Sequence, residues 1–203
     1  MADDADRRTQ RLATVPATFT ARQARTAGLS SRDLAALASA HAIEELSRGV
    51  YRRDDAAPTA NLDLIAVFTR APHAVLCGES ALALHELIDD IPHEIHIAVA
   101  RGSHRPAIAF PPTRTSQYAA DTFDYAIERF EAAPGEFVPV YSAARSVVDA
   151  MRLGGTAGRP LALSALNRYL RRHGQGGVAD LQDAATTLGG MAALRPAIET
   201  VLA

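Results

Sequence analysis

The sequence predicts an α+β fold in two parts, a small helical module that ends in a β-hairpin and a larger domain of mixed α/β structure. Two observations support this prediction. Capped helical segments followed by an alternating segment occupy the first fifty residues, and strand-like runs flanked by helix-like runs follow to the C-terminus. A chain of 203 residues, 48% of them hydrophobic, is long enough for one large domain or two small ones.

The first thirty residues contain two segments with helical start and stop signals. Arg7–Ala13 is expected to be a helix that ends before Pro16, because the residue before a proline is driven out of the helical region. Thr20 and Gln23 have the spacing of a capping box, in which each residue satisfies a backbone N–H of the other. The pair therefore predicts the start of a second helix, which runs to Ala27.

A third helix follows after a short turn. Gly28 supplies the positive φ that ends the second helix, and Ser30 and Asp33 repeat the capping pattern. Apolar residues at helical spacing predict the buried face of this third helix: Leu34, Leu37 and Ala38. Two capped helices separated by a two-residue turn are typical of a helix-turn-helix.

Residues 42–53 form two short runs around Gly49. Ile43, Leu46 and Val50 are apolar, so a small β-hairpin packed on the helices is expected. This hairpin is the wing of a winged helix-turn-helix. The acidic, proline-containing stretch Asp54–Thr59 has the composition of a linker. The sequence therefore predicts a winged helix-turn-helix domain at residues 1–56, followed by a larger α/β domain at residues 57–203.

The second domain is expected to contain strands flanked by helices. Asn61 and Ser80 are expected to act as helix caps. Alternating or β-rich runs predict strands at residues 94–99, 123–130 and 136–140. Helical patterns, with glycine-rich breaks at 154–158 and 174–177, cover residues 61–69, 81–87, 142–153, 160–172, 178–188 and 191–202.

The composition argues against several classes of chemistry. All 21 basic residues are arginine, so a P-loop, a protein kinase site, a Schiff base or a Glu-x-Lys nuclease site would lack its lysine. The single cysteine, Cys77, has apolar neighbours and predicts a packed, unreactive thiol. The sequence has no apolar run of about 20 residues and begins with acidic residues, so a cytoplasmic protein with no membrane contact is expected.

The histidines and hydroxyls give no pattern of an enzyme site. His93 and His96 would point to opposite faces of a strand, and Gly78–Leu82 lacks the second glycine of a nucleophile elbow. Arg145 and Asp149, four residues apart on a helix, predict an ion pair worth about 0.3–0.5 kcal/mol. We therefore expect no catalytic residue, no metal site and no cofactor.

Charge is distributed unevenly along the chain. Residues 7–53 hold nine arginines and three acids, residues 54–141 hold five and thirteen, and residues 142–203 hold seven and four. A basic head and an acidic middle are expected if the first meets phosphate and the second meets a different partner. Ordinary solvated faces are the alternative explanation.

The predicted helix-turn-helix suggests which residues would contact DNA. The second helix of this motif enters the major groove with its N-terminal residues nearest the bases. Ser30 and Ser31 can reach phosphate or base, and Arg32 can contact guanine with two hydrogen bonds. The other candidates lie on the preceding helix and on the wing: Arg22, Arg25, Arg48, Arg52 and Arg53. Each could instead be structural, the arginines as surface residues and Ser30 as a helix cap.

The segments Phe19–Ala24, Gly28–Ser30 and Arg48–Tyr51 resemble the N-terminal winged-helix domain of AbiEi-type antitoxins. Glu79–Leu87 and Ala144–Asp149 are similar to two motifs of that family's C-terminal domain, although Ser146 stands where threonine is common. The resemblance implies a bacterial antitoxin encoded beside a nucleotidyltransferase toxin. Such antitoxins bind inverted repeats in their own double-stranded promoter DNA and repress the operon, while the C-terminal domain neutralises the toxin.

Two alternatives remain open at this stage. The winged helix could bind a protein partner in place of DNA, which is a common use of the fold. The C-terminal domain could be an atypical phosphotransferase or nuclease, although the missing lysine argues against this. The protein is expected to be a monomer, or a dimer formed on a palindromic operator.

Overall fold

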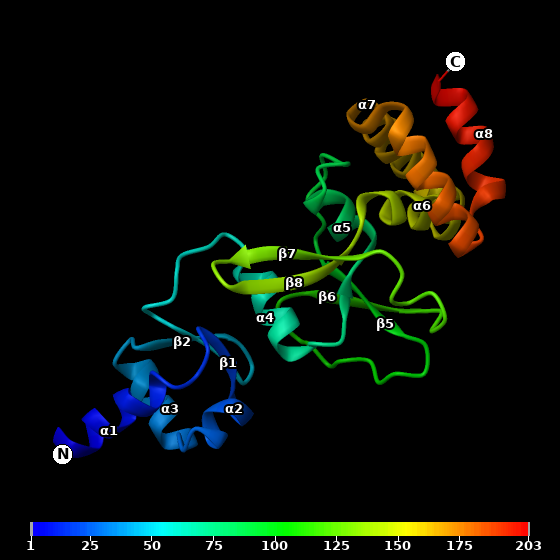
Figure 1. Ribbon diagram of the computed structural model, residues 1–203. Coiled ribbons are helices and arrows are strands. Elements are labelled where there is room, and N and C mark those ends of the chain that lie inside the picture. The colour runs from blue at the N-terminus through cyan, green and yellow to red at the C-terminus, as the bar shows by residue number, and fades with distance from the viewer. Residues whose placement is uncertain (1, 203) are drawn as a thin grey trace. The chain divides into compact units, whose positions relative to one another are not determined.

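The computed structural model describes residues 2–202 and has the predicted α+β class, with eight helices and two β-sheets in that range (Figure 1). The chain divides into two compact units. Unit 1 contains the residues up to His73 together with Pro106–Pro112 and Glu131–Val138. Unit 2 contains Ala74–Arg105, Thr113–Phe130 and the residues from Pro139 onward. The domain boundary expected at residues 56 and 57 stays a prediction.

Unit 1 contains the predicted helices and hairpin of the N-terminal part. Its elements are α1 (Ala2–Leu12), β1 (Thr18–Thr20), α2 (Ala21–Thr26), α3 (Ser31–Ser39), β2 (Ile43–Ser47), β3 (Val50–Arg53) and α4 (Leu62–Arg70). The three strands form an antiparallel sheet in the order β1-β3-β2. Strand β1 was not predicted, because three residues are too few to show an alternating pattern.

Both predicted capping boxes are present. The Gln23 N–H donates to Thr20 Oγ1 at 3.2 Å, and the Thr20 N–H donates to Gln23 Oε1 at 2.7 Å. Ser30 and Asp33 make the equivalent pair at 3.1 and 2.9 Å. Gly28, between the two helices, has the expected positive φ of 81°. These local bonds define where α2 ends and α3 begins.

The helices of unit 1 pack on the hairpin through one apolar core. The ring of Phe19 stacks on that of Tyr51 with centroids 5.9 Å apart, which joins β1 to β3. Ala38, on the predicted buried face of α3, packs at the edge of the core. The buried members come from α1, α2, α3, the strands and the loops that follow α1 and α2: Leu12, Val15, Phe19, Ala24, Leu29, Leu34, Leu37 and Ile43.

Two later segments of the chain complete unit 1. Ser47 Oγ donates to the Phe110 carbonyl at 2.5 Å, and Thr59 Oγ1 donates to the Ala132 carbonyl at 2.5 Å. Asn61 is the N-cap residue of α4 as predicted, but its side chain makes no cap bond. The Asn61 amide donates to the Ala132 carbonyl at 3.1 Å instead. The segment predicted to be a linker, residues 54–59, is therefore bonded through Thr59 to a residue from the second half of the sequence.

Unit 2 combines a sheet with a helical layer. Its helices are α5 (Gly78–Leu84), α6 (Ala143–Leu153), α7 (Gly155–Leu188) and α8 (Met191–Leu202). The sheet has the order β6-β5-β4-β8-β7 and consists of β4 (Val75–Leu76), β5 (Ile95–Ala100), β6 (Thr113–Tyr118), β7 (Ile127–Ala133) and β8 (Glu136–Tyr141). The residues of β7 and β8 within 131–138 belong to unit 1. Strand β5 is parallel to β6 and antiparallel to β4.

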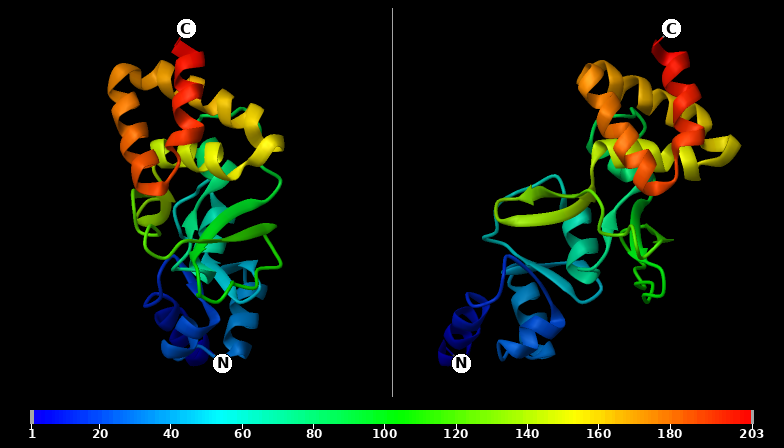
Figure 2. Two further views of the ribbon diagram at one scale, coloured as in Figure 1. Left: turned by 90° about the vertical axis from the view of Figure 1, so that its right-hand side faces the viewer. Right: turned by 45° about the vertical axis from the view of Figure 1, so that its right-hand side comes forward.

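The three C-terminal helices lie together as one layer (Figure 2), and their apolar faces share one core. Helix α7 was predicted as two helices separated by glycine-rich breaks. The helix instead begins at Gly155, and the second break is reduced to a kink at Gly174, where φ is 59°. A Cβ atom at Gly177 would lie 2.9 Å from the Tyr169 ring, so a glycine is needed there for packing.

Three expectations for unit 2 need correction. The strand expected at 123–130 lies at Ile127–Ala133, because the preceding residues form a turn. Ser80 does not cap α5; the N-cap position is Cys77, and Ser80 Oγ accepts from the His96 N–H at 2.9 Å. Strands β4 and β6 were not predicted, since β4 has two residues and the edge strand β6 has few apolar ones. Among residues 2–202, no helix is long and apolar enough to cross a membrane.

Candidate nucleic-acid interface

The eight residues predicted to contact DNA differ in exposure. Ser31 and Arg32 occupy the first turn of α3, where unsatisfied N–H groups and the helix dipole favour negative charge. A helix N-terminus of this kind is suited to phosphate. Six of the eight predicted residues are exposed: Arg22, Arg25, Ser30, Ser31, Arg32 and Arg48.

Four of the exposed residues have unengaged guanidinium groups. Within the described part of the chain these groups make no hydrogen bond or ion pair, and they belong to Arg22, Arg25, Arg32 and Arg48. They lie on α2, on the first turn of α3 and in the turn between β2 and β3. An arginine that is exposed and has no internal partner can meet a phosphate oxygen without breaking any bond of the folded protein.

Ser30 is engaged in its capping box. Its hydroxyl donates to Asp33 Oδ2 at 2.6 Å and accepts from the Asp33 N–H at 3.1 Å. The hydrogen bond from Ser30 lowers the pKa of Asp33, and the charges of Arg8 and Arg11 lower it further. The Ser30 hydroxyl proton is already donated to Asp33. While the capping box is intact, Ser30 can therefore accept a hydrogen bond from DNA but cannot donate one to a phosphate.

The first helix adds an arginine that the sequence did not single out. Arg11 Nη1 donates to the Gly28 carbonyl at 2.7 Å, which joins α1 to the turn between α2 and α3. Arg8 Nε lies 4.0 Å from Asp33 Oδ1. These two contacts bring α1 close to the start of α3. No local pattern could have shown them, because Arg11 and Gly28 are 17 residues apart.

Arg52 is a structural residue, which corrects its expected role on the wing. Its side chain is buried, with the residue only 6% exposed. Nη1 donates to Thr18 Oγ1 and to Glu136 Oε2, both at 2.6 Å, and Nη2 donates to the Ala57 carbonyl at 2.7 Å. The guanidinium group is surrounded by partners of unit 1 and offers nothing to a phosphate.

Arg53 is half-buried and already paired. Its Nε and Nη2 atoms donate to the two carboxylate oxygens of Asp55 at 2.8 and 2.5 Å, and Nη1 donates to the Val15 carbonyl at 3.3 Å. The hydrogen bond to Arg53 lowers the pKa of Asp55, and the same bond raises the pKa of Arg53. A phosphate would have to displace Asp55, so Arg53 is a weaker candidate than Arg48.

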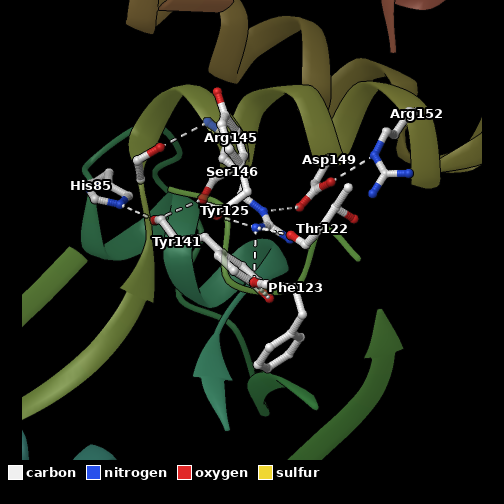
Figure 3. Close-up of polar contacts among 10 residues, drawn as sticks. His85, Thr122, Phe123, Tyr125, Tyr141, Arg145, Ser146, Asp149 and Arg152 are labelled. Carbon is white, nitrogen blue, oxygen red and sulfur yellow. Dashed lines mark hydrogen bonds and ion pairs between the residues drawn. The ribbon is translucent and has the colours of Figure 1, made fainter. Parts of the chain in front are cut away.

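Arg145 forms the main polar cluster of unit 2 (Figure 3). Its side chain is fully buried, and Nη1 donates to the carbonyls of Thr122, Phe123 and Tyr125. The guanidinium carbon lies 3.5 Å from the centroid of the Tyr141 ring, a cation–π contact. The cluster ties α6 to the turn that precedes β7. The Arg145 side chain therefore holds unit 2 together and is not available to a ligand at the surface.

Asp149 completes this cluster. Its Oδ2 accepts from Arg145 Nε at 3.5 Å, and its Oδ1 accepts from Arg152 Nε at 2.8 Å. Burial raises the pKa of Asp149, while the charges of Arg152 and Arg145 oppose that shift. The predicted pair exists, but the value for an exposed helical pair does not apply, because both side chains are buried.

Potentially reactive groups of unit 2 have ordinary structural roles. Cys77 is buried, as the prediction of a packed thiol requires, and burial raises the pKa of this thiol to about 12. His85 Nε2 lies 2.8 Å from the Tyr141 carbonyl oxygen. Within residues 2–202, no three histidine, cysteine or acidic side chains are placed to hold a metal ion.

The sequence matches no protein-family model, and no curated protein matches it significantly. A function for this chain is therefore inferred from its own residues. The residues that bear on it in unit 1 are four exposed arginines without an internal partner on α2, on the first turn of α3 and in the turn of the β2–β3 hairpin.

Proposed function

We propose that unit 1 binds double-stranded promoter DNA as a winged helix, and that the protein is an antitoxin that represses its own operon. One observation carries the DNA-binding part: Arg22, Arg25, Arg32 and Arg48 are exposed without internal partners, whereas Arg52 and Arg53 are paired. The order of elements from α2 to β3, with a glycine turn between the helices and a hairpin after them, supports a winged helix.

The contacts divide into base recognition and phosphate binding. Arg32, in the first turn of α3, would contact guanine with two hydrogen bonds, which discriminate against other bases by about 1–3 kcal/mol. Arg22, Arg25 and Arg48 would meet phosphates, which position the protein on the duplex without reading sequence. Since each neutralised phosphate releases counterions, affinity should fall steeply with salt.

The test is a fluorescence anisotropy titration with the duplex that lies directly upstream of this gene. A fragment of equal length and unrelated sequence serves as competitor, and the salt concentration is varied. Arg32→Ala should remove most of the preference for the upstream duplex, and Arg48→Ala should weaken binding to both duplexes equally. Arg171→Ala, which removes an exposed arginine of α7, is the matched control and should change neither.

A negative result would have a clear meaning. If the upstream duplex and the unrelated fragment bind equally weakly, and the salt concentration has no effect, then unit 1 does not bind DNA. A protein partner for the same surface would then replace the proposal.

The second part of the proposal assigns neutralisation of a nucleotidyltransferase toxin to unit 2. The two segments that resemble the antitoxin family contribute buried residues to one core of unit 2: Leu82, Leu87, Val147 and Val148. Residues 74–105 and 113–130, the part of unit 2 within the acidic stretch 54–141, carry eight acids and four arginines, a local charge that suits a basic partner.

Co-expression with the neighbouring gene tests this second part. The full chain should restore growth of cells that express the neighbouring gene product, and Arg32→Ala should restore growth equally well, because repression and neutralisation use different residues. Failure of both proteins to restore growth at matched protein levels would remove the antitoxin assignment and leave the DNA-binding part standing.

A further inference from the structure

A cavity of about 500 Å³ in unit 2 has no role in the function proposed above. It is bordered by the faces of β5 and β6 and by α5, α6 and α7. Apolar side chains such as Leu82 and Leu161 form part of the wall. The polar and titratable residues of the lining include Glu79, His96, Arg114, Ser116, Tyr118 and Asp149.

The register of two parallel strands gathers the hydrogen-bond donors on one wall. His96 of β5 lies directly beside Arg114 of β6. Ser116 and Tyr118 follow on β6 at intervals of two, so that all three β6 residues project to the same face of the sheet. An imidazole, a guanidinium group and a hydroxyl therefore line the same side of the cavity.

Two of these donors have no protein partner. Within residues 2–202, neither the Arg114 guanidinium group nor the Ser116 hydroxyl makes a hydrogen bond or ion pair. By contrast, Tyr118 is hydrogen-bonded to the Cys77 thiol. An edge strand can carry polar residues for solubility alone, but solubility does not require them to meet at a cavity.

The acids of the lining do not cancel the charge of Arg114. Asp149 is already paired with Arg145 and Arg152, so its negative charge is compensated. Glu79 is exposed, where solvent screens its charge. Arg114 is exposed as well, so solvent screens its charge too, and an anion in the cavity would be held mainly by the hydrogen bonds that Arg114 and Ser116 can donate.

The position of His96 is fixed by the residues around it. Its backbone N–H donates to Ser80 Oγ at 2.9 Å, and a Cβ atom at Gly78 would lie only 3.0 Å from its ring atom Nδ1. Burial and the charge of Arg114 lower the pKa of His96, whereas Glu79 and Glu94 raise it. A second negative charge beside the imidazole would favour its protonated form.

We propose that this cavity binds a small molecule through an oxyanion, a carboxylate or a phosphate, which is held by Arg114, His96 and Ser116. The planar guanidinium group can donate two parallel hydrogen bonds to either oxyanion. The apolar wall covers the rest of the ligand, as in most small-molecule sites. This site does not depend on DNA binding by unit 1.

The test follows the ring signal of His96 by NMR in the full-length protein. The signal is assigned by its loss in His96→Asn. Inorganic phosphate and acetate are titrated separately at ionic strength held constant with sodium chloride. We expect a saturable shift with at least one of these anions, and the anion that binds more tightly identifies the oxyanion. The pKa of His96 should rise when that anion is present, so binding should strengthen as the pH falls through this pKa.

Variants distinguish the site from general anion binding. Arg114→Gln should raise the apparent Kd at least tenfold, and Ser116→Ala should raise it by a smaller factor. Arg101→Gln removes an exposed arginine just beyond β5, outside the lining, and should leave the Kd unchanged. The proposal is overturned if chloride alone reproduces the shift, if neither anion shifts the signal, or if Arg114→Gln and Ser116→Ala both bind as the wild type does. Should Arg114→Gln fail to fold, Ser116→Ala decides alone.

Discussion

The arginines of unit 1 include exposed residues without internal partners and a buried residue that stabilises the fold, although their neighbours in the sequence do not distinguish the two kinds. Arg48 is exposed and unpaired, while Arg52, four residues later on the adjoining strand, is buried among three acceptors. Removing a guanidinium group from water is costly unless every donor finds a partner. The hydrogen-bond partners of each arginine determine its role. Substitution of a paired arginine should therefore lower stability, whereas substitution of an unpaired one should weaken DNA binding.

Arg52→Ala should lower the free energy of unfolding by about 3 kcal/mol, because Glu136 and the Ala57 carbonyl would lose their partner. Arg48→Ala should change it by less than about 0.5 kcal/mol, since the Arg48 side chain has no internal bond to lose. Urea denaturation measures both values. If Arg52→Ala is as stable as the wild type but binds DNA poorly, then Arg52 contacts DNA and its structural role is wrong.

The buried arginines show where prediction from sequence stops. The spacing of Arg145 and Asp149 gave the pair correctly, because neighbours one turn apart on a helix can be identified locally. Their burial could not be predicted, since the Tyr141 ring and the carbonyl of Thr122 are supplied by other elements. The partner of Arg52 is likewise remote, as Glu136 lies 84 residues away.

At the scale of single elements, local signals were sufficient for α2 and α3. Thr20 and Ser30 bond to residues three positions along the chain, so their patterns can be recognised without tertiary structure. Strand β6 had no comparable signal, because an edge strand needs no alternating apolar residues. For the same reason no local pattern pointed to the cavity residues Arg114 and Ser116.

The turn before α3 allows a prediction about the DNA-binding surface. Gly28→Ala would place a side chain at a φ of 81°, which costs about 1 kcal/mol, and its Cβ atom would lie 3.3 Å from Arg11 Nε. We expect a loss of unfolding free energy of about 1–2 kcal/mol and weaker DNA binding, because the start of α3 is displaced. Anisotropy and urea denaturation measure these two effects.

The matched control for this substitution is Gly135→Ala, also in unit 1. Gly135 has a φ of 78°, and a Cβ atom there would meet nothing within 4 Å. The loss of unfolding free energy in Gly135→Ala therefore measures the cost of the backbone conformation alone. The DNA affinity of this variant should equal that of the wild type. Equal losses of stability in the two variants would mean that Arg11 gives way at no cost, and equal losses of affinity would contradict the link between the turn and DNA binding.

At the scale of the whole molecule, unit 1 is assembled from stretches that are distant in sequence. Thr59 and Asn61 both bond to the Ala132 carbonyl, and Ser47 bonds to the Phe110 carbonyl. The acidic, proline-containing composition of residues 54–59 is typical of linkers, but composition does not reveal such bonds. The proposed DNA-binding residues thus lie in a unit that depends on segments 106–112 and 131–138.

A fragment of residues 1–73 tests this dependence, since it holds every proposed DNA-contacting residue but lacks both later segments. Its Arg52 loses Glu136, and the hydroxyls of Ser47 and Thr59 lose their acceptors. We expect the fragment to unfold at lower temperature than the full chain and to bind the upstream duplex at least tenfold more weakly, as circular dichroism and anisotropy would show. Glu136→Gln in the full chain should reproduce part of the stability loss, because the neutral amide weakens the bond to Arg52. If the fragment of residues 1–73 folds as stably and binds as tightly as the full chain, the N-terminal part is autonomous, and unit 1 does not depend on the later segments.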